Sequence, residues 1–176
     1  MKTIFLLISL SSGLLSFSQE RTRSAHYFGL HAGSTTAYGL SYRYWPKRFG
    51  IEFTTLPTFK KYLPIGKSFI KSKISTGLSF LYKIKESKFV DLYTYLGGFT
   101  LFEKNYETYY DQVNYETIYI KKEHLDLNIG LGLGVKFKFI EVMDFNLQLG
   151  YGMYKINQPN DFYSLVSGEV GLYYNF

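Results

Sequence analysis

A strict alternation of apolar and polar residues between Leu125 and Phe139 constrains the fold of this chain more than any other feature. Successive side chains of a β-strand point to opposite faces of a sheet, so the alternation predicts a strand and excludes an amphipathic helix. Glycine, lysine, Asp126 and Asn128 occupy one face. The other face is uninterruptedly apolar and is expected to contact lipid: Leu125, Leu127, Ile129, Leu131, Leu133, Val135, Phe137 and Phe139.

The same pattern predicts seven further strands. Segments of about 9 to 11 residues are long enough to cross a bilayer as tilted strands, and an even number of strands closes a barrel. The sequence therefore predicts an all-β fold, a membrane-spanning antiparallel up-and-down β-barrel of about eight strands. The other expected strands are residues 27–33, 38–45, 49–56, 69–83, 89–102, 143–152 and 162–176.

Glycine, proline and the aromatic residues support this assignment. Of the glycines in these strands, only Gly98 and Gly168 share the parity of the apolar face, and a narrow barrel needs small residues inside. The four prolines, Pro46, Pro57, Pro64 and Pro159, are expected in turns or loops. Aromatic residues are expected to form a girdle at one rim: Tyr27, Phe28, Tyr44, Trp45, Phe49, Tyr82, Phe89, Phe137, Phe139, Phe145, Tyr174 and Phe176.

The first eighteen residues have the layout of a secretory signal peptide, with Lys2, an apolar run and a small-residue end at Ser16 to Ser18. The sequence predicts cleavage near Ser18/Gln19, so that residues 1–18 are a signal peptide and residues 19–176 form the barrel domain. The chain contains no cysteine, which excludes disulfides and thiol chemistry.

The final residues carry a resemblance. Val170, Leu172, Tyr174 and Phe176 alternate to a terminal phenylalanine, which resembles the signal that barrel-insertion machinery recognises on outer-membrane proteins. With the expected signal peptide and hairpins, the chain is similar to the small eight-stranded outer-membrane β-barrels of the OmpA, OmpX and OmpW type. The resemblance implies a location in the outer membrane of a Gram-negative cell, and it transfers no function.

The predicted inward face carries many ionisable groups, which we expect to neutralise one another across the lumen. An eight-stranded barrel is only wide enough for side chains, so an open pore is disfavoured. The inward polar residues are His31, Arg43, Glu52, Lys83, Asp91, Asp126, Asn128, Lys136, Lys138, Gln148 and Glu169.

Two external segments are candidates for contact with other molecules. The motif Asn-Tyr-Glu-Thr occurs twice within residues 103–120 and predicts a protruding Tyr-rich hairpin, with Tyr106, Tyr109, Tyr110, Tyr115 and Tyr119 as its contact residues. The other segment is a basic loop at residues 57–73. Its Lys60, Lys61 and Lys67 are candidate ligands for lipopolysaccharide phosphates. A solvated loop remains the alternative for both.

These features favour a non-enzymatic role in surface contact, adhesion or envelope integrity. The expected partners are outer-membrane lipid and lipopolysaccharide, the barrel-insertion machinery and an extracellular ligand of unknown identity; the mild basic excess does not indicate nucleic acid, and no cofactor, metal or catalytic residue is assigned. One alternative is an enzyme that acylates or deacylates lipid A, through His124 and Asp126 with Ser79 or Ser167. Another is a carrier of small apolar ligands, based on Tyr93, Tyr95, Phe99 and Leu101 facing inward.

Overall fold

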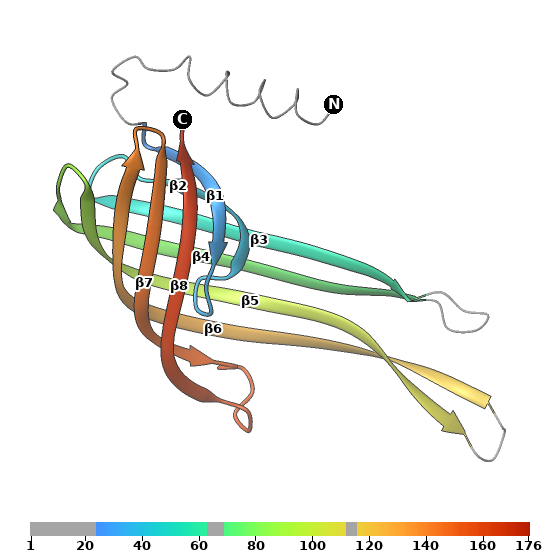
Figure 1. The fold of residues 1–176 in the computed structure, drawn as a ribbon. Coiled ribbons are helices and arrows are strands. Elements are labelled where there is room, and N and C mark those ends of the chain that lie inside the picture. The colour runs from blue at the N-terminus through green and yellow to red at the C-terminus, as the bar shows by residue number, and fades with distance from the viewer. Residues whose placement is uncertain (1–23, 63–68, 112–115) are drawn as a thin grey trace, which may run out of the picture.

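The computed structural model describes residues 24–62, 69–111 and 116–176, and it shows a closed barrel of eight antiparallel strands (Figure 1). Each strand pairs with the next along the chain, and β1 pairs with β8 to close the ring. The predicted fold is confirmed. The strands are β1 (His26–Ala32), β2 (Tyr38–Tyr44), β3 (Phe49–Tyr62), β4 (Phe69–Glu86), β5 (Val90–Asp111), β6 (Glu116–Ile140), β7 (Met143–Tyr154) and β8 (Tyr163–Asn175).

Alternation along each strand sorts side chains between lipid and lumen. On β6, Leu131 and Leu133 are 58% and 55% exposed, whereas the neighbouring Lys136 is 2% exposed. Gly98 and Gly168 are the strand glycines that point outward, as predicted: an added Cβ would meet open space at Gly168 and ordinary contact at Gly98. A chain with this apolar exterior and polar interior spans a membrane. Within the described residues, no helix is long and apolar enough to cross a bilayer.

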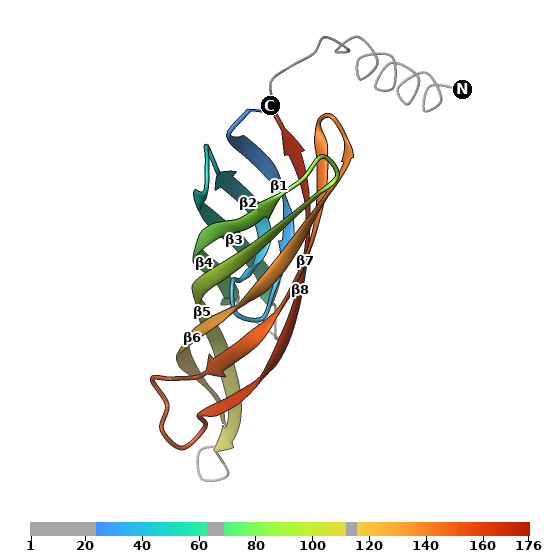
Figure 2. The same ribbon diagram turned by 90° about the vertical axis from the view of Figure 1, so that its left-hand side faces the viewer.

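The short turns lie at the same end of the barrel as the C-terminus, and we call this the periplasmic end (Figure 2). Most of the predicted aromatic girdle surrounds it, with ring pairs such as Phe49–Tyr82 at 5.0 Å and Phe139–Phe145 at 6.3 Å. The assignment of Tyr27 and Trp45 to the girdle was wrong, since both are buried in the lumen. Their positions share the parity of inward residues such as Arg43, so alternation turns their rings inside.

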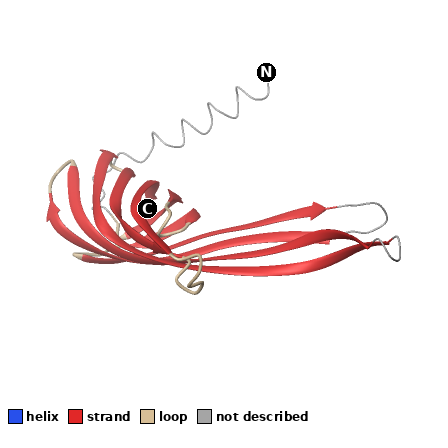
Figure 3. Ribbon diagram, turned by 90° about the horizontal axis from the view of Figure 1, so that it is seen from below, coloured by secondary structure: helices blue, strands red, loops and turns tan. Residues whose placement is uncertain are grey.

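Strands β3 to β6 extend beyond the rest of the barrel as a four-stranded sheet (Figure 3). We call this extension, residues 57–62, 69–73, 103–111 and 116–124, the arm. Two expectations were therefore wrong. Residues 57–73 are mostly paired strand, and Pro57 lies within β3 opposite Ile74. Pro57 is tolerated there because the pairing of β2 with β3 ends at Thr55, which leaves β3 as an edge strand.

Strands β1 and β2 are much shorter than their neighbours, and they end before β8 and β3 reach the extracellular rim of the barrel. The pairing of β1 with β8 ends at Ala32 opposite Val170, while β8 continues beside β7 as far as Tyr163. The connection between β1 and β2, residues 33–37, folds into the lumen, where Thr35, Thr36 and Ala37 are almost fully buried. We call residues 33–37 the plug.

Candidate functional site

The periplasmic half of the lumen is filled by paired charges. The Arg43 guanidinium donates a hydrogen bond from Nε to Glu52 Oε2 at 2.6 Å and lies 4.1 Å from the centre of the Tyr173 ring. Lys136 and Lys138 bind the two oxygens of Asp91 at 3.1 and 2.6 Å. The prediction that inward charges neutralise one another across the lumen is confirmed at these pairs.

Aromatic rings occupy the space between these ion pairs. Trp45 meets Tyr93 edge-on at 5.1 Å, and Gln148 donates a hydrogen bond to the Tyr93 hydroxyl at 2.9 Å. Tyr93 and Tyr95 are fully buried and face inward, as predicted. The described side chains of the periplasmic half thus pack against one another and fill that part of the lumen.

Above this layer the plug is held by one carboxylate. Glu169 on β8 accepts hydrogen bonds from the Thr35 backbone N–H at 3.0 Å and from the hydroxyls of Thr35 and Thr36. The Thr36 hydroxyl also bonds His31 Nε2 at 2.6 Å. A buried carboxylate that accepts several hydrogen bonds fixes the position of the loop that donates them.

Four inward glycines make room for the plug, one on each of β4 to β7. An added Cβ would lie 2.5 Å from the Thr35 side chain at Gly130, and 2.6 Å from the Thr36 methyl at Gly97. Gly77 and Gly152 are equally close to the same two threonines. The sequence indicated small residues inside the barrel, but nothing in it identified residues 33–37 as what fills that space.

An open pocket of about 510 Å³ lies on the extracellular side of the plug. Phe99 and Leu101 of β5 form its far wall and face inward, as predicted. Tyr154 and Tyr163 stack in parallel beside it with ring centres 4.9 Å apart, and Ser34 of the plug lies at its base, bonded to the Tyr154 hydroxyl at 2.8 Å. Asp126, Asn128 and Lys155 also line the space. Because most of its exposed wall is still apolar, we call it the apolar pocket.

A second cavity of about 280 Å³ lies on the inner face of the arm and is lined by three lysines, Lys60, Lys71 and Lys73. Glu103 also lines it and bonds Lys73 at 2.7 Å. We call this cavity the basic niche. Of the lysines predicted to contact lipopolysaccharide, Lys60 lies here, Lys61 has the opposite parity on β3 and is exposed, and Lys67 lies outside the described residues.

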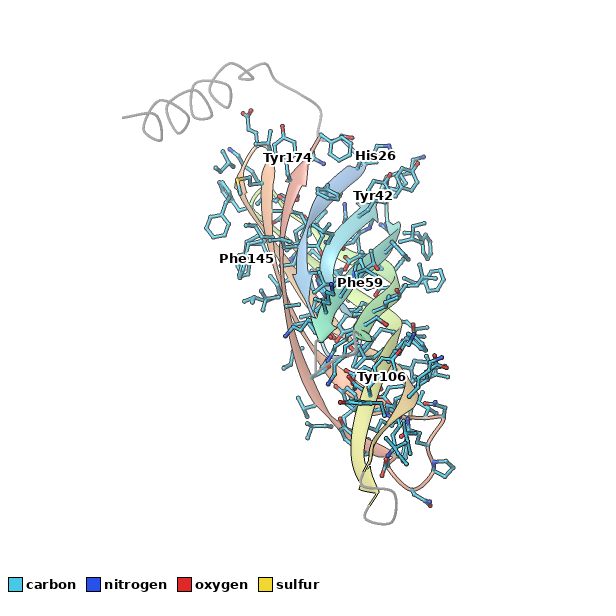
Figure 4. All side chains as sticks on the ribbon, turned by 90° about the vertical axis from the view of Figure 1, so that its right-hand side faces the viewer. His26, Tyr42, Phe59, Tyr106, Phe145 and Tyr174 are labelled. Atoms are coloured by element: carbon cyan, nitrogen blue, oxygen red, sulfur yellow. The ribbon has the colours of Figure 1, made fainter. Side chains whose placement is uncertain are left out.

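Residues 103–111 and 116–120 form a paired hairpin, with Asp111 opposite Glu116. Figure 4 shows Tyr106 on the arm, at the opposite end of the molecule from His26 and Tyr174. Tyr106 and Tyr119 lie two pairs apart in the register, and the centre of the Tyr106 ring lies 5.7 Å from the Lys104 ammonium. Tyr109 and Tyr110 lie in β5 opposite Ile118 and Thr117, and Tyr115 falls outside the described residues.

The outer face of the arm is charged as well as aromatic. Lys121, opposite Tyr106, donates a hydrogen bond to Glu123 at 2.6 Å. This bond lowers the pKa of the Glu123 carboxyl and raises the pKa of the Lys121 ammonium. Both groups are therefore ionised near neutral pH. On the outer face of β6, these charged side chains come directly before Leu125, the first of the lipid-facing apolar residues.

The candidate catalytic pair has a simple polar environment. His124 Nε2 lies 2.7 Å from Asp126 Oδ1, and the Gln158 amide lies within hydrogen-bonding distance of both. Ser167 is 3.5 Å from the Tyr95 hydroxyl, and Ser79 Oγ is next to Gly97 at the plug. The hydrogen-bonding neighbour of the His124–Asp126 pair is thus an amide, and an amide cannot serve as the nucleophile of acyl transfer.

The residues proposed as an assembly signal lie on the outside of the last strand. Val170, Leu172, Tyr174 and Phe176 are all exposed, and the Phe176 ring lies 6.1 Å from that of His26 at the periplasmic end. Residues 1–18, the expected signal peptide, lie outside the described residues.

The fold and the apolar exterior define a small eight-stranded outer-membrane β-barrel. No family model matches the sequence, and no curated protein is significantly similar to it. Among solved structures, the N-terminal β-barrel domain of Pseudomonas aeruginosa OprF is 14% identical, with a TM-score of 0.49 over 88% of this chain and all of that chain.

Two other solved structures are similar to this chain. The attachment invasion locus protein Ail of Yersinia pestis, in complex with the heparin analogue sucrose octasulfate, is 16% identical, with a TM-score of 0.39 over 86% of this chain and 94% of that chain. Neisserial surface protein A is 19% identical, with a TM-score of 0.39 over 88% and 98%. These likenesses concern the fold alone.

Proposed function

We propose that this protein is a non-enzymatic outer-membrane barrel that holds an external contact surface, the arm, clear of the lipid. The observation that carries the proposal is the continuous pairing of β5 with β6, which runs from Val90 opposite Phe137 to Asp111 opposite Glu116. Because the backbone hydrogen bonds between these strands continue from the barrel into the arm, the arm has a fixed orientation relative to the barrel. The arm is therefore suited to adhesion or to contact with neighbouring envelope components.

The outer face of the arm has the composition of a contact surface. Tyr106 and Tyr119 offer large side chains with two rotatable bonds, which lose little conformational entropy on binding. Lys104 and Lys121 lie on the same face. Aromatic and cationic side chains together can contact polysaccharide or protein, and the hydrogen-bonding hydroxyls add orientation.

Replacing residues 103–124 with a two-residue Asn-Gly turn, which joins the paired residues Phe102 and Leu125, tests the proposal. Cells that display the full chain should adhere to plates coated with heparin, an anionic polysaccharide, several-fold better than cells that display the shortened chain, or should resist detergent better. Surface display and heat-modifiability on gels establish that both barrels are folded. Equal adherence and equal detergent resistance would contradict a role for the arm.

A pair of point variants separates the tyrosines from the bulk of the arm. Tyr106→Ser with Tyr119→Ser should lower adherence, whereas Tyr42→Ser, an exposed tyrosine at the periplasmic end, should not (Figure 4).

Processing between Ser18 and Gln19 belongs to the same proposal, and the intact mass of the purified mature chain tests it.

A further inference from the structure

The barrel wall has a gap on its extracellular half, above the short β1–β2 hairpin. Among the described residues, β8 has no strand partner on its β1 side from Tyr163 to Glu169, because its pairing with β1 covers only Val170 to Asn175, while its other edge stays paired with β7. Across the gap, β3 has no described strand partner on its β2 side from Leu56 to Tyr62, because its pairing with β2 ends at Thr55, while its other edge stays paired with β4. We call this gap, bounded by these two strand edges and the plug, the port.

At its end next to the β1–β2 hairpin, the port opens toward the membrane. Val166 on β8, Leu30 on β1 and Leu40 on β2 point outward around it and are 62%, 61% and 48% exposed. Leu165 has the parity of the buried lumen residues Ser167 and Glu169, yet it is 59% exposed. The interior of the barrel is thus open to the side at the height where its exterior is still apolar.

Unpaired strand edges are costly in hydrocarbon unless they line a cavity. Behind the port lies the apolar pocket, whose lining includes Gly168 on the β8 edge and Tyr38 at the start of β2. Its volume of about 510 Å³ is within the range of about 300–1,000 Å³ that is usual for small-molecule sites. A flexible apolar chain can therefore pass from the bilayer through the port into this pocket.

The basic niche adjoins the pocket on its extracellular side. Leu101 lines the pocket and Glu103, the next residue on the same face of β5, lines the niche. Tyr38, a pocket residue, interacts with the Lys73 ammonium of the niche. The described lining of the niche includes three lysines and the carboxylate of Glu103, so cationic side chains are available to an anion carried by the molecule whose chain fills the pocket.

We propose that the port admits an acyl chain of lipid A from the outer leaflet, with the chain in the apolar pocket and a lipid phosphate on Lys60, Lys71 and Lys73. The order of the two cavities matches such a molecule: the apolar pocket lies nearer the membrane and would take the acyl chain, and the basic niche lies on its extracellular side and would take the phosphate. The site is formed by the inner faces of the barrel and of the base of the arm, so it does not depend on the outer face of the arm contacting another surface. Lipid A is bound here and not modified.

A single fluorophore inside the pocket tests this site. The chain has no cysteine, so Leu101→Cys provides one thiol, which is labelled with bimane in the full mature chain reconstituted in phosphatidylcholine nanodiscs. Adding lipid A to the nanodiscs should shift the bimane emission to shorter wavelength and lower its quenching by aqueous iodide several-fold. Inorganic phosphate alone should cause neither change.

The two outward glycines provide a matched pair of variants. Gly168→Trp places a large side chain at the edge of the port, where an added Cβ meets nothing within 4 Å, and it should abolish both changes. Gly98→Trp adds the same side chain to the lipid-facing surface of β5, and it should leave both changes intact. If Gly168→Trp does not fold, Leu101→Trp fills the pocket from within, and lipid A retained after detergent exchange replaces the bimane signal.

The lysines are tested in the same way. Lys60→Gln, Lys71→Gln and Lys73→Gln together should weaken retention of lipid A at least tenfold, whereas Lys61→Gln with Lys121→Gln, outside the niche, should not. The proposal is overturned if bimane responds equally in Gly168→Trp, if phosphate alone reproduces the response, or if protection depends on protein concentration and not on lipid, which would indicate a second copy at the port.

Discussion

The backbone N–H of Thr35 donates a hydrogen bond to Glu169 across a 3.0 Å gap, although the two residues are 134 positions apart in the chain. This bond ties the connection between the first two strands to the last strand of the barrel. It fixes the plug in the lumen, and the plug in turn forms the base of the apolar pocket.

Replacing Glu169 should therefore loosen the plug. Glu169→Ala leaves the Thr35 N–H and two buried hydroxyls without their acceptor, and each unsatisfied group costs about 1–3 kcal/mol. We expect the free energy of unfolding in urea to fall by at least about 3 kcal/mol by this count. The buried Trp45, the single tryptophan, reports unfolding by its fluorescence. Glu123→Gln on the exposed arm is the control, and an equal loss there would contradict the prediction.

The glycines around the plug should tolerate no side chain. In Gly130→Ala the new Cβ would lie 2.5 Å from the Thr35 side chain, so the variant should displace the plug and lower the unfolding midpoint. Gly98→Ala, which points to lipid, should change it little. Adding Thr35→Gly to Gly130→Ala should remove the clash, so that this double variant is as stable as Thr35→Gly alone; an additive loss would mean that the two residues do not touch.

The Arg43–Glu52 pair is buried, so replacing one partner should destabilise the barrel more than replacing both partners with apolar residues. Arg43→Met leaves the Glu52 carboxylate without its guanidinium and should destabilise the barrel by about 3–5 kcal/mol. The double variant Arg43→Met with Glu52→Leu should recover most of that loss, because no buried charge remains unpaired. The temperature at which the folded band is lost on a gel measures all three proteins. A double variant less stable than Arg43→Met would refute this account.

The terminal phenylalanine is expected to act in assembly and not in final stability. Phe176→Ser should lower the amount of barrel inserted in cells several-fold, while the protein refolded in detergent unfolds at the usual urea concentration. Phe49→Ser removes an exposed aromatic residue from the same end and should leave insertion closer to normal. Equal insertion of the two variants would contradict an assembly role for Phe176.

Much of the fold follows from alternation within single strands. The parity of Leu131, Lys136 and Gly168 predicts which side of the wall each occupies, because a strand presents its side chains to opposite faces regardless of its partners. Strand ends were predicted less well: Pro57 was expected in a loop, but β3 continues through it. An edge strand can accept a proline, and the sequence does not state which strands have lost a neighbour.

The sequence by itself thus determined a barrel with an apolar exterior, a charged interior and an extended Tyr-rich hairpin. Tertiary structure alone decided that residues 33–37 turn inward onto Glu169, that β1 and β2 stop short and open the port, and that Lys60, Lys71 and Lys73 share one niche. These are relations between strands, set by register and strand length around the ring. The periodicity of one strand carries no information about the height at which its neighbour ends.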